Sequence, residues 1–224
     1  MRDLEGAVTS TIVDSDLAFH AIRDYVPGDS RRHVHWKSTA KTGQLMVRQY
    51  EETRRSRIAI SIDLDITQYG SDDEFEMAIS AAASLSLQAV RDGREVVITT
   101  SSKIPRHVVH RVHSIQTLPT LTPASMLDGM SGIESSVDVM PFEMVAGMTA
   151  QEAQHLSMVF LVTGSQMPVP RLRKAAVAFS ADVKVVGIRA ELGAQPASQS
   201  ARELRLLTIG MLHDLAPLML RGAV

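Results

Sequence analysis

Two aspartates and a threonine, all with oxygen-bearing side chains, come directly after an apolar run. Asp63, Asp65 and Thr67 alternate with apolar residues behind the run at 57–62. Their side-chain oxygens are the ligands that a hard divalent cation such as Mg²⁺ or Ca²⁺ prefers. The alternative is that the two aspartates are strand-end acids, stabilised by helix N-termini or by arginines. Both interpretations stay open at this point.

The histidines offer a second, weaker metal hypothesis. His33 and His35 would share one face of a strand, and three more histidines recur at intervals of three: His107, His110 and His113. No cysteine joins them, and a proline at position 105 weakens a helix there, so we interpret both groups as surface or loop clusters.

The sequence contains none of the usual motifs for nucleotide binding or serine hydrolysis. The sequence has neither a Gly-x-x-x-x-Gly-Lys phosphate loop nor a Gly-x-Gly-x-x-Gly stretch. Ser84 and Ser86 fall inside a predicted helix, and no Gly-x-Ser-x-Gly elbow occurs. We therefore predict that the chain is not an enzyme.

Composition sets the broad class. The 224 residues carry a net charge of −2 and are 45% hydrophobic, which suffices for one large domain with an appendage. The lack of cysteine excludes disulfides, thiolate zinc sites and cysteine nucleophiles, and it fits a reducing compartment. No apolar run approaches the roughly 20 residues that cross a bilayer, so we expect a soluble, cytoplasmic-side part whose membrane anchor lies outside this chain.

Elements that position these residues alternate along the chain. We predict strands at 57–64, 95–100, 157–163, 183–188 and 204–209, and helices at 71–92, 169–180 and 211–220. Capping boxes are expected at Ser71 and Thr149, a left-handed helix end at Gly93, a helix start at Thr122 and a polar loop over 191–201. This order predicts an α/β fold, an open and mostly parallel sheet with helices on both faces. Residues 1–57 would be an N-terminal extension and 58–224 the main domain.

The extension holds the most specific motif. Its residues are Arg23-x-Tyr25-x-Pro27-Gly28-Asp29, followed by Arg32, Trp36 and a small-residue segment, with a strand predicted at 45–51. Pro27-Gly28 predicts a turn in which Gly28 takes a positive φ, and Asp29 would then bond the backbone or an arginine. This stretch resembles the signature of domain of unknown function 58, and residues 20–100 carry the resemblance.

That resemblance implies a von Willebrand factor type A-like domain, an N-terminal pair of transmembrane helices absent from this sequence, and association with a MoxR-type AAA+ ATPase. Von Willebrand type A domains often bind Mg²⁺ through Asp-x-Ser-x-Ser, a loop threonine and a later Thr-Asp-Gly. Here Asp63 matches, Asp65 and Thr67 replace the two serines, and Thr163-Gly164-Ser165 lacks the later aspartate. The loop threonine could be Thr117, Thr120 or Thr122. We expect a degenerate site without a cofactor, with Mg²⁺ or Ca²⁺ binding as the alternative.

The leading hypothesis is a non-enzymatic interaction or scaffold domain that binds a protein partner, a MoxR-type ATPase by resemblance, and no nucleic acid. Loops 65–71, 117–123 and 164–168 would form its binding face, at the carboxyl ends of the strands. One rival is a divalent-metal-dependent hydrolase acting through Asp63 and Asp65. The other is nucleic-acid binding through residues 20–57. This segment contains nine basic residues and only four acidic ones, and its Tyr25, Trp36 and Tyr50 could stack on bases. Alternatively, that segment is a polar clasp on the main domain, with Trp36 as its apolar anchor.

Overall fold

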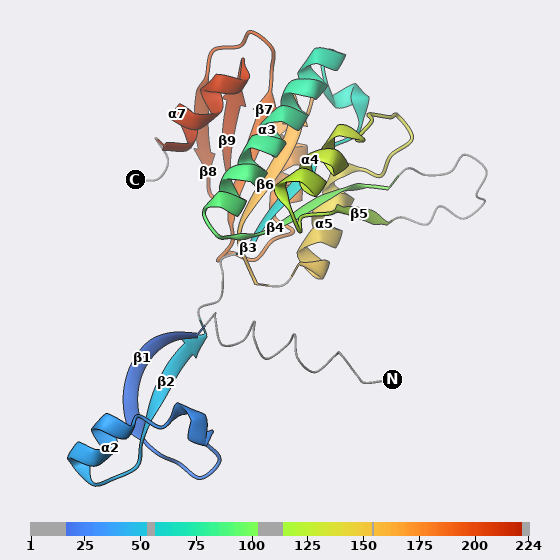
Figure 1. Cartoon of the computed structure of the whole chain (residues 1–224). Coiled ribbons are helices and arrows are strands. Elements are labelled where there is room, and N and C mark those ends of the chain that lie inside the picture. The colour runs from blue at the N-terminus through green and yellow to red at the C-terminus, as the bar shows by residue number, and fades with distance from the viewer. Residues whose placement is uncertain (1–16, 53–56, 103–113, 154, 221–224) are drawn as a thin grey trace, which may run out of the picture. The chain divides into compact units, whose positions relative to one another are not determined.

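A computed structural model describes residues 17–52, 57–102, 114–153 and 155–220. The chain divides into two units, Met1–Arg55 and Ser56–Val224, whereas the sequence predicts a boundary after Arg57. The placement of one unit relative to the other is not determined, so each is described by itself (Figure 1). Within the described residues, no helix is both long and apolar enough to span a bilayer.

The second unit is built on a seven-stranded sheet. Its strand order is β5-β4-β3-β6-β7-β9-β8, in which the five inner strands are parallel and the two outer ones antiparallel. The strands are β3 (Arg57–Ile62), β4 (Glu95–Ser101), β5 (Ile115–Leu118), β6 (Leu156–Gly164), β7 (Lys184–Ala190), β8 (Ala197–Ala201) and β9 (Leu204–Ile209). The predicted α/β class with a mostly parallel sheet is confirmed.

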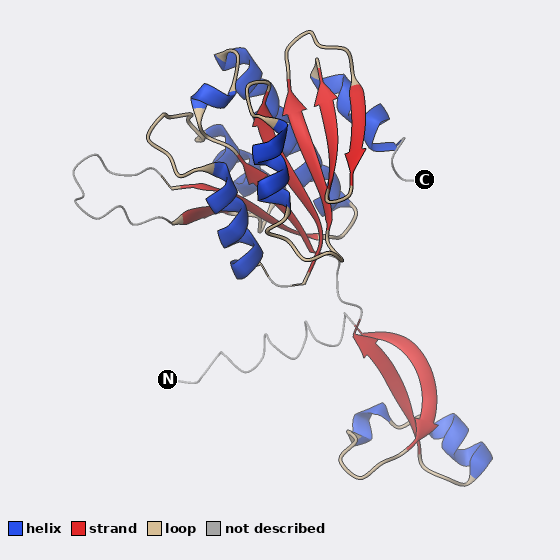
Figure 2. Cartoon of the chain, turned by 180° about the vertical axis from the view of Figure 1, so that it is seen from behind, coloured by secondary structure: helices blue, strands red, loops and turns tan. Residues whose placement is uncertain are grey.

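Helices cover both faces of this sheet, as Figures 1 and 2 show from opposite sides. One face packs against α3 (Asp72–Arg91), α4 (Pro123–Ser131) and α7 (Leu215–Leu220), and the other against α5 (Phe142–Glu152) and α6 (Val169–Ala176). Because the inner strands are covered on both sides, their side chains are mostly apolar on both sides: in β3, all residues after Arg57 are buried, and of these only Ser61 is polar. Two short 3₁₀ helices, η2 (Ile66–Gln68) and η3 (Leu212–Asp214), lie between these elements.

Local signals placed the ends of α3. Ser71 caps the helix, since its hydroxyl accepts a hydrogen bond from the Glu74 amide at 3.2 Å. At the other end Gly93 has a φ of +70°, the left-handed conformation predicted for it. The helix start at Thr122 is also confirmed by a complete capping box.

Two element predictions were wrong. Thr149 does not start a helix but lies in the last turn of α5, where the apolar spacing of residues 142–149 continues one helix and overrides the motif. Its hydroxyl donates to the Val145 carbonyl at 2.9 Å and lies 2.8 Å from the Thr99 hydroxyl, which in turn lies 2.9 Å from that of Ser61. These three hydroxyls (Ser61, Thr99 and Thr149) form a buried polar contact between sheet and helix.

The second wrong prediction is the polar loop at 191–201, because β8 occupies 197–201. A strand that is exposed on both faces at the margin of a sheet needs no apolar alternation. Its sequence therefore carries no strand pattern.

The first unit is a hairpin with two short helices beside it. Strands β1 (Leu17–Asp24) and β2 (Met46–Glu52) are antiparallel, and η1 (Arg31–His33) and α2 (Trp36–Thr42) lie between them in sequence. Val34 and Val47 are buried and form a β-bridge, which makes a small apolar centre. His33 and His35 do not share a strand face, since His35 caps α2 and its Nδ1 accepts from the Ser38 amide at 3.3 Å. His107, His110 and His113 lie outside the described residues.

Candidate functional site at the carboxyl rim of the sheet

Asp63 stands directly after β3, at the carboxyl ends of the parallel strands. One interpretation of the sequence has Asp63 offer its oxygens to a cation, but the residue is only 2% exposed. The Asp65 amide donates to Asp63 Oδ1 at 3.1 Å, and the Thr163 hydroxyl donates to Oδ2 at 2.9 Å. The carboxyl group therefore joins the ends of β3 and β6 instead of facing solvent.

Burial governs the protonation of Asp63. Removal from water disfavours the charged form and raises the pKa of Asp63 to about 7. The hydrogen bonds from the Asp65 amide and the Thr163 hydroxyl, and the positive charge of Arg171, act in the opposite direction without overcoming it. Near neutral pH the Asp63 carboxyl is thus divided between its protonated and ionised forms.

Asp65 and Thr67 lie beside Asp63 but bond mainly to each other. Asp65 Oδ1 accepts from the Thr67 amide at 3.0 Å and from the Thr67 hydroxyl at 2.6 Å. The Gln68 side-chain amide donates to Asp65 Oδ2 at 3.2 Å and to the Thr67 hydroxyl at 2.9 Å. These bonds hold η2 in place, and we call Asp63, Asp65, Thr67, Gln68 and Thr163 the carboxyl rim.

Glu74 closes one side of the rim and was not foreseen in this role. The sequence suggested that its side chain would complete the capping box at Ser71. Instead the Ser165 amide donates to Glu74 Oε1 and the Ser165 hydroxyl to Oε2, so a buried carboxylate ties α3 to the loop after β6. Gly70 leaves room for this contact, because a Cβ there would lie 2.9 Å from Glu74 Oε2. Gly164 permits a different close approach, that of the loop after β6 to the end of η2, because a Cβ there would lie 2.8 Å from the Cα of Tyr69.

An arginine, Arg171, supplies a positive charge that acts on the two aspartates. Arg171, in the first turn of α6, donates from Nε and from one terminal nitrogen to the two carboxylate oxygens of Glu143 on α5, both at 2.9 Å. These bonds lower the pKa of Glu143 and raise that of Arg171. A terminal nitrogen of Arg171 also lies 3.5 Å from Gln68 Oε1, which connects the ion pair to the rim.

The rim fits a resident divalent cation poorly. Among the described residues, no three His, Cys, Asp or Glu side chains gather in a way that could hold a metal. Both oxygens of Asp63 and of Asp65 accept hydrogen bonds from protein groups, and Arg171 already places a positive charge close to them. An arginine near the strand-end acids was expected under one of the two interpretations left open by the sequence, and the lack of a resident cation stays a prediction.

The loop threonines predicted for this rim do not reach it. Since β5 runs antiparallel to β4, the chain after Leu118 heads back toward the amino ends of the parallel strands. Thr117 and Thr120 there line a cavity of about 240 Å³ together with Arg57 and Glu95. Loop 117–123 therefore drops out of the predicted binding face. Ser136 takes a place beside the rim instead, since its carbonyl accepts from the Ile66 amide at 3.3 Å and its amide donates to the Leu64 carbonyl at 2.9 Å.

The signature turn of the first unit has the geometry that its sequence predicts. The Asp29 amide donates to the Val26 carbonyl across Pro27-Gly28 at 3.0 Å, and Gly28 has a φ of +113°. Asp29 accepts two hydrogen bonds from Arg23, both at 2.7 Å, and one from the Val26 amide at 2.9 Å. These bonds, chiefly that from Arg23, lower the pKa of Asp29 to about 2. The Tyr25 amide pairs with the Leu45 carbonyl at 2.9 Å and extends the hairpin.

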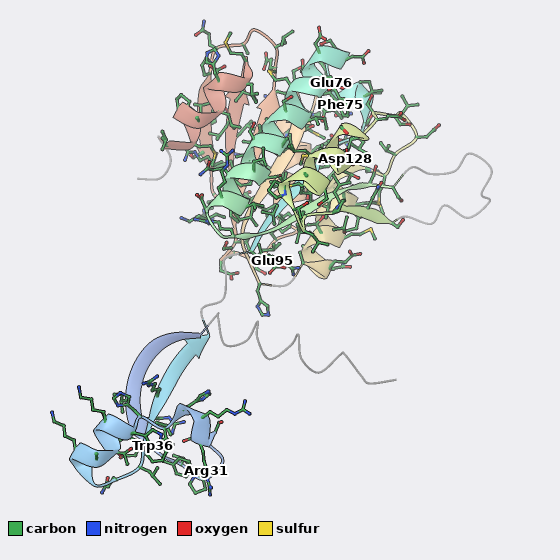
Figure 3. All side chains as sticks on the ribbon, viewed as in Figure 1. Arg31, Trp36, Phe75, Glu76, Glu95 and Asp128 are labelled. Carbon is green, nitrogen blue, oxygen red and sulfur yellow. The ribbon has the colours of Figure 1, made fainter. Side chains whose placement is uncertain are left out.

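Trp36 is not an anchor inside this unit. It is 70% exposed at the start of α2, and Figure 3 labels it together with Arg31 in the same unit. Arg31 and Arg32, in the preceding η1, are exposed too. Of the other basic residues in this segment, Lys37, Lys41 and Arg48 are exposed as well, Arg23 and Arg57 are half-buried, and Arg54 and Arg55 lie outside the described residues.

Comparison with known proteins gives the family. The profile of the family described as protein of unknown function DUF58 matches residues 21–189, which is more than half of the chain. This chain belongs to the DUF58 family. The uncharacterized protein YeaD of Bacillus subtilis (strain 168) is 30% identical over 73 residues, which are 33% of this chain and 17% of YeaD. The match thus spans less than a fifth of that relative.

Solved structures resemble the DUF58 chain more distantly. Proximal thread matrix protein 1 of the mussel byssus aligns with a TM-score of 0.46 and 13% identity, over 75% of this chain and 46% of its own. The RO (RSR) protein of Deinococcus radiodurans aligns with a TM-score of 0.44 and 16% identity, over 76% and 35%. A von Willebrand factor type A protein from Catenulispora acidiphila aligns with a TM-score of 0.36 and 12% identity, over 64% and 34%.

Proposed function

We propose that this chain is a non-enzymatic interaction or scaffold domain of a membrane-anchored protein, and that it works with a MoxR-type AAA+ ATPase. The class of partner is the one expected from the resemblance to domain of unknown function 58, and the chain's membership of that family is the reason for choosing it as the first partner to test. The observation that carries the proposal is the hydrogen bonding of the carboxyl rim: Asp63 is buried, and Asp65 and Thr67 are held by each other. A rigid polar edge of this kind can be recognised by another protein but presents no activated nucleophile.

The solvent exposure of the rim residues indicates which of them a partner would contact. Thr67 is exposed and Asp65 half-buried, and Arg171 with Glu143 continues the edge onto α5 and α6. Polar groups that are already fixed lose little side-chain entropy when a partner binds them. Asp63 is left out of the contact surface, because it supports the rim from inside.

Binding of a purified MoxR-type ATPase, measured by calorimetry or by recovery on an affinity resin, tests the proposal. We expect Asp65→Ala and Thr67→Ala to weaken binding at least about fivefold, as loss of a rim contact worth about 1 kcal/mol implies. Asp128→Ala on α4 and Thr117→Ala on β5 are matched controls, because both residues are exposed and lie away from the rim. Equal binding by all four variants would refute the rim as the contact surface, and no binding by the unaltered chain would refute the partner.

A second candidate function rests on the exposed Trp36 of the first unit. A bare indole next to exposed arginines could stack on a base while the arginines neutralise phosphates. Trp36 is the sole tryptophan of the sequence, so its fluorescence reports directly on such binding. Quenching by single-stranded oligonucleotides that weakens steeply with added salt would support this function. Unchanged fluorescence at low salt would exclude it.

A further inference from the structure

The last strand of the sheet, β8, has a free edge. It pairs with β9 on one side, and none of the described strands pairs with its other side, as Figures 1 and 2 show. The two strands are joined by the two-residue turn at 202–203. In such a hairpin the residues flanking the turn, Ala201 and Leu204, exchange both backbone hydrogen bonds, and the pattern then alternates. The amide and carbonyl groups of Ser198 and Ser200 therefore point away from the sheet.

This edge lacks the features that keep edge strands apart. Proteins usually protect a free edge with lysine, proline or another interruption within the strand. The strand Ala197–Ala201 contains no proline and no charged residue, and its three central residues are exposed. Arg205, the charge nearest on β9, is held by the Ser198 hydroxyl at 3.2 Å and by the Leu218 carbonyl at 3.4 Å.

The strand is also complementary to itself. Its sequence, Ala-Ser-Gln-Ser-Ala, reads the same in both directions. An antiparallel pair of two copies about an axis at Gln199 would therefore set Ala197 against Ala201, Ser198 against Ser200 and Gln199 against itself. Charges near a two-fold axis repel their own images, and this strand has none. Beyond it, Arg202 would meet Pro196, so no like charges are opposed.

From this juxtaposition we infer that β8 pairs with β8 of a second copy of this chain, which joins two sheets into one. The outward groups of Ser198 in one copy bond those of Ser200 in the other. The two Gln199 side chains then form a non-hydrogen-bonded pair, whose Cα atoms lie about 4.5 Å apart. Because a five-residue edge buries little area, the dimer forms reversibly as protein concentration rises. This inference is independent of the carboxyl rim.

Disulfide trapping tests the register, and the natural chain helps because it contains no cysteine. Gln199→Cys in the full chain should form a covalent dimer under mild oxidation, since its Cα separation falls within disulfide range. Ser198→Cys alone should cross-link at least about tenfold more slowly, because its own image lies diagonally at about 7–8 Å. A mixture of Ser198→Cys and Ser200→Cys chains should restore fast cross-linking. Ser80→Cys on α3, an exposed site away from β8, gives the background rate of random collision.

Light scattering on the unaltered chain tests the dimer itself. The mass should rise from 24.4 kDa toward twice that value between about 1 and about 500 µM protein. Ser200→Pro removes an outward donor while leaving the ladder to β9 intact, so it should keep the fold, checked by circular dichroism, and abolish the rise. A mass of 24.4 kDa at every concentration overturns the inference. So does a dimer that survives Ser200→Pro, or a Gln199→Cys rate no higher than that of Ser80→Cys.

Discussion

Replacement of Asp63 by asparagine should make the protein more stable at alkaline pH. The carboxyl group is buried, its pKa is raised to about 7, and its two oxygens accept from the Asp65 amide and the Thr163 hydroxyl. An asparagine side chain has nearly the same shape and carries no charge at any pH in the range. It keeps an oxygen for the Asp65 amide, and its NH₂ group can donate to the Thr163 hydroxyl.

The sign and size of this change in stability follow from the linkage between proton binding and folding. The folded chain holds the Asp63 proton up to a pKa of about 7, whereas the unfolded chain releases it near 3.8. The stability that this group contributes is therefore fully present below pH 3.8 and is lost as the pH rises to 7. A difference of about 3 pKa units corresponds to about 4 kcal/mol. The unfolding free energy of Asp63→Asn should thus exceed that of the unaltered chain by up to about 4 kcal/mol above pH 7, and this difference should vanish near pH 4.

Urea denaturation followed by circular dichroism, at several pH values from 4.5 to 8.5 with a chelator present, measures this difference. Titrations common to both proteins cancel when the two unfolding free energies are subtracted, so that Asp63 dominates what remains. A difference that does not change with pH would refute the reasoning. A variant that is less stable than the unaltered chain at pH 8 would refute it as well, because it would mean that the folded protein favours the charged carboxylate.

Two further predictions concern the loop after β6 and the signature turn. Gly164→Ala should lower the unfolding free energy by about 1–3 kcal/mol, because the added Cβ would overlap backbone atoms. Gly147→Ala, in open space on α5, should instead raise the unfolding free energy by about 0.5–1 kcal/mol. Urea denaturation measures both values, and equal effects of the two variants would contradict the close approach at Gly164. In the first unit, NMR titration should give Asp29 a pKa of about 2, and Arg23→Ala should raise it toward 3.8 while the Val26 amide exchanges faster with solvent. An Asp29 pKa unmoved by Arg23→Ala would show that the Arg23 hydrogen bonds do not lower it.

Features encoded within a few residues could be predicted from the sequence. The N-cap of Ser71, the positive φ of Gly93 and the turn at Pro27-Gly28 each depend on local backbone preferences, and the structure has all three. It could likewise be predicted that Asp63, at the carboxyl end of a parallel strand, lies close to the ends of the neighbouring strands. Its burial could not be foreseen, because it depends on α5, α6 and β6 closing around it.

The remaining parts of the site depend on distant pairs. Arg171 and Glu143 are 28 residues apart, and Ser165 and Glu74 are 91 apart. No spacing rule connects such residues, and each reads by itself as an ordinary surface charge or cap. The direction of β5 was equally hidden, since only its pairing with β4 carries Thr117 away from the rim.

The hydroxyls of Ser61, Thr99 and Thr149 constrain how the second unit can respond to a partner. A helix held to a sheet by apolar contacts alone can slide or roll at modest cost, because such contacts have no preferred direction. Three interlocked hydroxyls admit one register, so the end of α5 that carries Thr149 is pinned across β3 and β4. Glu143 lies six residues earlier, about 9 Å along the same rigid helix, and its position is pinned in turn. If a partner separates Arg171 from Glu143, we therefore expect α6 to move and α5 to stay in place, because these hydroxyl contacts hold only α5.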